Sequence, residues 1–247
     1  MCTVSWRRES RGYELFFNRD ERHGRGAELP PASREAEGVR YVAPIDPDSG
    51  GTWLLVNEWG LTVGLLNDYD CPWQPSDAVG TASRGSLVLS LASARDVDEA
   101  GTLAQRQPLT RTRPFHLLLF DDRQEAQLHW AGETLVRRAK AETVPPVTSS
   151  SFATSAVIAA RRAKFAALAS VAPMPSGDEL RVYHFHHDSE AGAYSVNMCR
   201  PDAATRSISR IVVEPAEIRF SYWPQRWPGA PRGAEPTELR LARRSRP

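Results

Sequence analysis

The chain has 247 residues, and its 31 Lys and Arg residues nearly balance its 30 Asp and Glu residues. This balance excludes a strong field that would attract nucleic acid or an anionic membrane. The three cysteines form no CxxC pair and no disulfide framework, which favours a reducing compartment. The chain lacks the roughly 18-residue apolar stretch of a membrane span and a hydrophobic N-terminal signal core. We therefore expect a cytoplasmic protein.

The first segment predicts a β-hairpin. Strand-like runs at residues 3–6 and 13–17 flank the turn signal Ser10-Arg11-Gly12. The polar tetrad Asn18-Arg19-Asp20-Glu21 follows the second run, so pairing of the two runs would place it beside Cys2. A thiol with Arg and Asp beside it is a candidate nucleophile. The alternative is a small buried cysteine on an edge strand, followed by a solvated charge run at a turn.

Cys2 gains a second property if Met1 is removed, which is normal processing before a small second residue. Removal would leave Cys2 with a free α-amine whose pKa lies near ~8, so the amine is partly neutral at pH 7. The amine could then act as the base for its own thiol, which is the arrangement of N-terminal nucleophile enzymes.

The next elements are mostly strands. Residues 22–38 read as an exposed loop, and 39–43 as a short strand. Apolar runs at 52–56 and 61–66 flank Asn57-Glu58-Trp59-Gly60, which indicates a second hairpin. The second of these runs ends in Asn67, so polar groups again follow the end of a strand.

Two helices and a meander are expected in the middle of the chain. Ser83 is a candidate N-cap for the first helix, and residues 96–107 predict the second. The continuous apolar run at 115–120 is typical of a fully buried strand. Runs at 127–131 and 134–137 extend it as a meander.

In the last third, a hydroxyl-rich run at 147–152 leads into a basic helix over 156–171. Residues 180–188 read as a strand that would point His184 and His186 to one face, a spacing compatible with a metal, although a clear third ligand is lacking. We expect no metal, because ordinary polar histidines explain the pattern. Three closing strands follow, at 194–200, 207–214 and 218–223.

These elements predict an α+β fold. Short turns join most strands, so two mainly antiparallel sheets should pack face to face with helices outside, as a four-layer α-β-β-α sandwich. We expect a single domain over residues 1–224. Residues 225–247 are rich in Pro, Gly and Arg, and we expect them to form a flexible tail.

The ordered motifs resemble those of the NRDE group, the transport-and-Golgi-organisation protein 2 family. The resemblance rests on Met1-Cys2, Asn18-Arg19-Asp20-Glu21, Gly50-Gly51-Thr52-Trp53, Gly60-Leu61, Asn67, Ser83-Arg84-Gly85 and Thr148-Ser149-Ser150. The same landmarks are distantly similar to choloylglycine hydrolase and penicillin V acylase. Both groups have the N-terminal nucleophile hydrolase fold, which is the α-β-β-α sandwich.

The resemblance implies catalytic roles for four residues. Cys2 would be the nucleophile, and Arg19 would favour its thiolate. Asp20 would hold the α-amine or Arg19 in place. Asn67, or the backbone N–H beside it, would donate to the oxyanion.

It also implies substrate-binding roles. Ser149 occupies the position at which the acylases have an Asn as the second oxyanion donor. A serine hydroxyl can also donate a hydrogen bond, but it extends less far from the backbone than an Asn amide. The late arginine of those enzymes corresponds to Arg161 or Arg162, of which we take Arg162 as the candidate, and Asn18 belongs to the same site. In the acylases, two residues separate the corresponding Arg and Asp, whereas Arg19 and Asp20 are adjacent in this sequence. The sequence therefore leaves open which residue contacts the α-amine of Cys2.

Two functions compete on this basis. The first is a cysteine hydrolase that cleaves a linear amide C–N bond in a small molecule and requires no cofactor. The second is a non-catalytic carrier of haem, lipid or acyl-CoA, with Cys2, His184, His186 or His187 near a haem. The sequence leaves the oligomeric state open.

Overall fold

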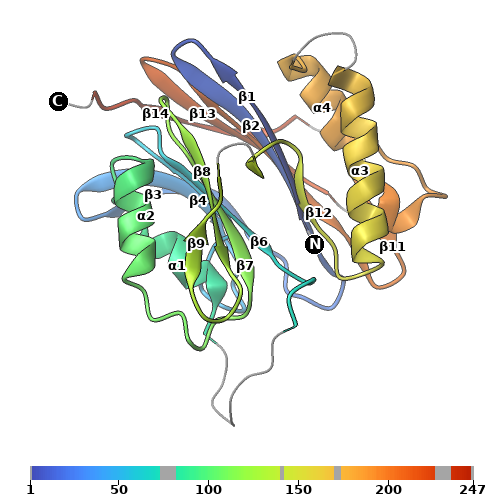
Figure 1. Cartoon of the computed structure of the whole chain (residues 1–247). Coiled ribbons are helices and arrows are strands. Elements are labelled where there is room, and N and C mark those ends of the chain that lie inside the picture. Colours follow the sequence, from blue (N-terminus) through green and yellow to red (C-terminus); the bar gives the residue numbers. More distant parts are fainter. Residues whose placement is uncertain (1, 73–81, 140–141, 170–173, 226–234, 246–247) are drawn as a thin grey trace.

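Two seven-stranded antiparallel sheets pack face to face in the computed structural model, which describes residues 2–72, 82–139, 142–169, 174–225 and 235–245. Helices α1 (Arg84–Ser90) and α2 (Val97–Gln105) lie outside one sheet, and α3 (Thr154–Ala169) and α4 (Gly177–Phe185) lie outside the other (Figure 1). The four-layer α-β-β-α sandwich is therefore confirmed.

The first sheet carries both ends of the described chain. Its strands run in the order β10-β1-β2-β12-β13-β14, and β11 pairs with β12. Their bounds are β1 (Cys2–Glu9), β2 (Gly12–Arg22), β10 (Val147–Ser149), β11 (Cys199–Arg200), β12 (Ala203–Val213), β13 (Glu217–Pro224) and β14 (Thr237–Ala242).

The second sheet is a meander in chain order, β3-β4-β5-β6-β7-β8-β9. Its strands are β3 (Leu29–Ala36), β4 (Val39–Ile45), β5 (Leu54–Asn57), β6 (Thr62–Asn67), β7 (Phe115–Phe120), β8 (Glu125–Trp130) and β9 (Leu135–Arg137). The expected β5–β6 hairpin is present, and the side chain of Asn57 accepts hydrogen bonds from the N–H groups of Trp59 and Leu61, both at 3.1 Å.

Alternation along the strands builds the core between the sheets. Val4, Leu15 and Phe17 of the first sheet are fully buried against Leu66 and Leu118 of the second. Because side chains alternate along a strand, the residues between them point to the helix layers. Each sheet therefore has an inner face toward the other sheet and an outer face toward its helices.

Local signals explain the helix starts. The side chain of Ser83 caps α1, and Asp96 caps α2 by accepting hydrogen bonds from the N–H groups of Asp98 and Glu99. The Ser83 cap was expected from the sequence, whereas for α2 only the range of the helix was predicted. Helix α3 covers the expected basic helix as far as residue 169, and residues 170 and 171 lie outside the described ones.

The predicted strand over 180–188 is wrong, because residues 180–185 belong to helix α4. Ser176 and Glu179 form a capping box that starts this helix. Leu180, Tyr183 and His184 are buried on one side of it, at the 3–4 spacing of a helix. His184 and His186 therefore do not share the face of a strand.

Three further expectations are corrected. The segment 22–38 contains strand β3. The expected strand over 194–200 begins at the last residue of the 3₁₀ turn η2 (Gly192–Tyr194), and only its last two residues form a strand, β11. Part of the expected tail 225–247 forms β14, because Leu239 and Leu241 pack against the core between the sheets. Among the described residues, no helix is long and apolar enough to cross a membrane.

Candidate active site

Strand register brings three of the predicted site residues together. Cys2 pairs with Arg19 of β2 on one side and with Ser149 of β10 on the other. Directly paired residues of antiparallel strands point to the same face, with Cβ atoms ~4.5–5.5 Å apart. This face is the inner one, because Val4 and Phe17 follow on it in the core. We call Cys2, Arg19 and Ser149 the Cys2 row.

The Cys2 thiol is held toward its protonated form. Burial raises the pKa of Cys2 above its ordinary value, and the carboxylate of Asp20 raises it further. The backbone N–H of Asp20 and the guanidinium of Arg19 lower the pKa of Cys2 without offsetting burial. Deprotonation of this thiol therefore calls for a base close to it.

Arg19 is buried, and its charge is matched by carboxylates. Its Nη1 donates to Glu28 at 3.2 Å, and its Nη2 lies 3.8 Å from Asp46. Its guanidinium also lies over the ring of Trp53, 4.3 Å from the centroid. These contacts fix the side chain beside Cys2 and leave only part of its field for the thiol.

Asp20 lies on the outer face of the same strand, opposite to Arg19. Both terminal nitrogens of Arg161 lie 3.2 Å from its Oδ2, and Thr205 donates to its Oδ1 at 2.7 Å. Arg161 is completely buried and also donates to the Thr3 hydroxyl at 2.6 Å. We call Asp20, Arg161, Thr205 and Thr3 the Asp20 network.

Helix α3 thus separates the two arginines that the sequence left as alternatives. Arg161 faces the first sheet and binds Asp20, whereas Arg162 is exposed and lines a cavity beside Asp68. Arg161 is therefore the arginine that contacts Asp20, a distinction between the two residues that the sequence left open. The position of the buried face of the helix was the signal, since Val157 and Phe165, each four residues away, are buried as well.

Two predicted residues lie away from the Cys2 row. Asn67 shares a register position with Phe115, which packs under α1 and α2, and its Nδ2 donates to the Tyr69 hydroxyl at 2.8 Å. Asn18 is buried on the outer face, where its side chain binds the ring and the backbone carbonyl of His184 at 2.7 and 2.9 Å. Asn18 therefore anchors α4 to the first sheet.

Ser149 has a free hydroxyl. It is 4% exposed, and within the described parts of the chain its Oγ has no hydrogen-bond partner. A buried polar group without a partner costs free energy, so its presence calls for an explanation. Its neighbour Thr148 differs, because its hydroxyl lies 2.8 Å from the hydroxyl of Thr3.

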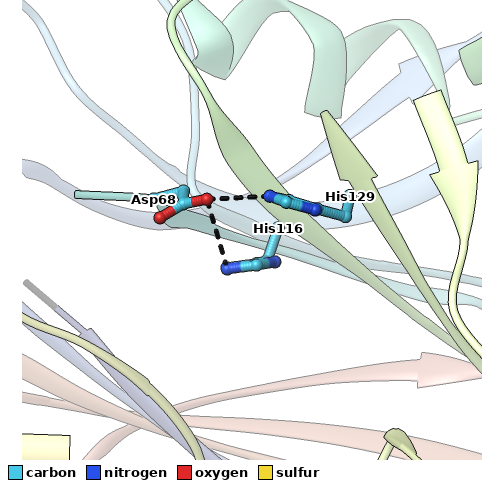
Figure 2. Close-up of side chains that lie close together, drawn as sticks. All are labelled: Asp68, His116 and His129. Carbon is cyan, nitrogen blue, oxygen red and sulfur yellow. Dashed lines mark hydrogen bonds and ion pairs between the residues drawn. The ribbon is translucent and has the colours of Figure 1, made fainter. Parts of the chain in front are cut away.

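The second sheet contributes a polar cluster that sequence reasoning missed. Asp68, His116 and His129 lie together in the described structure and could hold a metal ion (Figure 2). The strand register was the missing signal, since β7 and β8 pair His116 with His129. His184 is unsuited to this role, because its two ring nitrogens are engaged by Ser5 and Asn18 at 2.6 and 2.7 Å.

The fold has known structural relatives. A variant of the conjugated bile acid hydrolase from Clostridium perfringens superposes with a TM-score of 0.59 at 12% identity, covering 98% of this chain and 92% of that one. The N-acylethanolamine-hydrolyzing acid amidase orthologue of Caenorhabditis elegans gives a TM-score of 0.56 at 8% identity, covering 85% and 92%. These likenesses show the N-terminal nucleophile hydrolase fold.

Sequence comparison identifies the family. No curated protein sequence matches this chain significantly. The family model described as Transport and Golgi organisation 2 matches residues 1–168, which is more than half of the 247 residues. The chain therefore belongs to the Transport and Golgi organisation 2 family.

Proposed function

We propose that this protein is a cysteine N-terminal nucleophile hydrolase that cleaves a linear amide C–N bond in a small molecule. The observation that carries the proposal is the Cys2 row, in which a terminal thiol stands between a buried guanidinium and an unpartnered buried hydroxyl. Met1 lies outside the described residues, and the proposal includes its removal.

The free α-amine of Cys2 is the base that the raised pKa of its thiol calls for. It takes the thiol proton, and the sulfur attacks the carbonyl carbon of the amide. The C=O electron pair moves to oxygen, where the Ser149 hydroxyl donates to the oxyanion. One such donor is typically worth ~2.7–4 kcal/mol. A backbone N–H beside Asn67 is the proposed second donor; that of Asp68 donates to the Pro114 carbonyl at 3.1 Å and would exchange this bond for the oxyanion.

The tetrahedral intermediate then collapses. The C–N bond breaks, and the amine product leaves with the proton that the α-amine had taken, so Cys2 keeps the acyl group as a thioester. The α-amine next takes a proton from water, and the hydroxide attacks the thioester. The carboxylic acid is released and the thiol is restored, so the reaction consumes one water and needs no cofactor.

The charged residues have positioning roles in this mechanism. Arg19 supports the thiolate from the inner face. Asp20 acts through the strand: its backbone lies beside the Cys2 thiol while Arg161 holds its carboxylate on the outer face. We propose Arg162 for substrate binding at the cavity that it lines.

The structural relatives support the substrate class. One is named for hydrolysis of conjugated bile acids and the other for hydrolysis of N-acylethanolamines, which are linear amides. We propose cytoplasmic small molecules with an acyl–amide bond as the substrates.

Three proteins test the proposal: the wild type, Cys2→Ala, and Cys199→Ser as the matched thiol control. Each is incubated with a panel of N-acyl amides and an acylating probe, and intact mass reports Met1 removal and any adduct. We expect one acyl adduct and turnover in the wild type and in Cys199→Ser, and neither in Cys2→Ala. A form with an uncleavable extension before Cys2 should also be inactive.

Turnover that survives in Cys2→Ala would refute the mechanism. Absence of both adduct and turnover in the fully processed wild type would refute the hydrolase and favour the carrier. A haem titration then tests the carrier, because specific binding should shift the Soret band and respond to Cys2→Ala or to substitution of His186 or His187.

A further inference from the structure

Three neighbouring strands of the second sheet bring a carboxylate and two imidazoles together. His116 of β7 pairs with His129 of β8 and, on the other side, with Leu66 of β6. Asp68 follows the end of β6, two residues beyond Leu66, so it continues the same face. Leu66 is in the core between the sheets, so all three side chains belong to the inner face (Figure 2).

The donor atoms lie at nearly the separations that a metal requires. Asp68 Oδ2 is 2.7 Å from His129 Nε2 and 3.9 Å from His116 Nε2. All three ligand atoms lie within 4.8 Å of one another. Bonds of ~2.0–2.1 Å at tetrahedral angles separate donors by about 3.3 Å. Side-chain shifts below about 1 Å would therefore form the site.

The carboxylate is oriented by its own loop. Asp68 Oδ1 accepts hydrogen bonds from the N–H groups of Asp70 and Cys71, at 2.9 and 3.3 Å. These bonds leave Oδ2 to face the histidines. The Asp68 carboxylate can therefore bind a metal ion through Oδ2.

The imidazoles are also held from behind. Gln127 Nε2 lies 3.0 Å from His116 Nδ1, and Arg138 Nη2 lies 3.1 Å from His129 Nδ1. Polar groups on the far nitrogen orient a metal-binding histidine. The Nε2 atoms of both rings thus stay directed toward Asp68 Oδ2.

The contact between Arg138 and His129 opposes metal binding in the present arrangement. Arg138 can only donate, so Nδ1 of His129 accepts in this arrangement and its Nε2–H donates to Asp68. A metal on Nε2 requires that proton on Nδ1, where Arg138 would then face it as a second donor. The Arg138 side chain is 41% exposed and can swing away, whereas a turned Gln127 amide can accept from His116.

The cluster opens on a cavity of about 920 Å³ between the second sheet, β10 and α3. Thr148 and Arg162 line its other side. We propose that Asp68, His116 and His129 bind one divalent first-row transition-metal ion, with its remaining coordination positions open to this cavity. Two imidazoles and one carboxylate suit Zn²⁺ or Fe²⁺, whereas Mg²⁺ and Ca²⁺ prefer all-oxygen sites. The residues of the Cys2 row are not among the described residues that line this cavity.

Zn²⁺ and Co²⁺ are the probes for the test. Chelator-treated full-length Cys2→Ala protein removes the terminal thiol as a competing ligand, and all variants are made in it. Equilibrium dialysis should find one Zn²⁺ per chain, and Co²⁺ should give d–d absorption bands. Asp68→Asn and His129→Gln should each weaken binding at least about 100-fold, beyond the 10–100-fold typical of outer-shell partners. His23→Gln, a histidine outside the cluster, should change nothing.

Arg138→Gln is the second variant, because it replaces the opposing donor with a group that can accept from Nδ1. It should tighten Zn²⁺ binding several-fold, and circular dichroism checks that each variant is folded. The inference is overturned if the wild-type cluster binds no Zn²⁺ at micromolar concentration. It is equally overturned if Asp68→Asn and His129→Gln, both folded, bind Zn²⁺ as tightly as their parent.

Discussion

The two faces of strand β2 differ most where Arg19 and Asp20 adjoin. On the outer face, Asp20 meets Arg161 and Thr205 in a network without exposed side chains. On the inner face, the Cys2 row contains a half-buried thiol and a hydroxyl without a described partner. Residues next to each other in sequence thus enter environments of opposite character, because a strand alternates its side chains.

The difference between the two faces suggests that the outer face stabilises the fold and the inner face binds the substrate. Buried ion pairs resist disruption, since removing one partner leaves an uncompensated charge. An unpartnered buried hydroxyl contributes no hydrogen bond to stability and is available to a ligand. We therefore expect outer-face substitutions to change the free energy of unfolding, and inner-face substitutions to change catalysis by the proposed hydrolase.

The largest expected effect comes from breaking the Asp20 network. Arg161→Met should lower the free energy of unfolding by about 3–5 kcal/mol, because Asp20 would stay buried without its cation. Urea denaturation followed by circular dichroism measures the loss. The double variant Asp20→Asn with Arg161→Met should recover part of it. A loss below about 1 kcal/mol in Arg161→Met would show that Asp20 finds solvent or another partner.

The next effect tests the inner face. Ser149→Ala should lower kcat by about 10²–10³-fold, the cost of one oxyanion donor, and leave the free energy of unfolding nearly unchanged. Ser209→Ala is the matched control, because Ser209 is also a buried inner-face serine whose Oγ has no partner in the described structure. The control should keep both activity and stability. Equal kcat in Ser149→Ala and the wild type would remove Ser149 from the mechanism.

Acid should weaken the outer face through His184. Burial, with a smaller effect of the Arg161 charge, lowers the pKa of His184 to about 3. Below the unfolded-state pKa of ~6.5, only the unfolded chain takes up this proton, so stability falls as pH falls. The loss approaches ~1.4 kcal/mol per pH unit and reaches roughly 2 kcal/mol by pH ~5.

Unfolding free energies at several pH values between 7.5 and 5 measure this dependence. The dependence of the unfolding free energy on pH should be less steep in His184→Gln than in the wild type, by up to one proton. The neutral His116 adds to the slope with the same sign. If His184→Gln keeps the full wild-type slope, His184 is protonated in the folded protein.

The sequence predicted the fold where pattern and turn chemistry agreed. Strand β7 matches its predicted range, and Ser83 caps α1 as expected. The prediction from sequence was wrong at α4. Aromatic and histidine residues have a weak helical preference, so tertiary packing decides whether this segment is a helix or a strand. The prediction also failed at β14, since two apolar residues among charges reveal a strand only when a neighbouring edge is available to pair.

The candidate site was predictable only in part for the same reason. Pairing of the first two strands could be deduced from the turn between them, which placed the tetrad 18–21 beside Cys2, and the structure gives the register that sets Arg19 opposite Cys2. The alignment of β10 with β1 joins residues more than 140 positions apart, so no local signal contains it. The contact between Asp20 and Arg161 depends further on the rotation of α3, which separates Arg161 from Arg162 by a helical step of about 100°.

Arg161 and Arg162 are adjacent on α3 but face opposite ways, so they form a closely matched pair, and substitution of Arg162 has the smallest predicted effect. Arg162→Ala should change the free energy of unfolding by less than about 0.5 kcal/mol, because its side chain is exposed, whereas Arg161→Met should cost several kcal/mol. If Arg162 binds substrate at the cavity, its loss should raise KM up to about fivefold, as expected for an exposed ion pair of ~0.2–1 kcal/mol, with kcat unchanged. Arg162→Lys should retain most of the affinity. A large loss of stability in Arg162→Ala, comparable with that of Arg161→Met, would contradict the assignment of opposite faces to the two arginines.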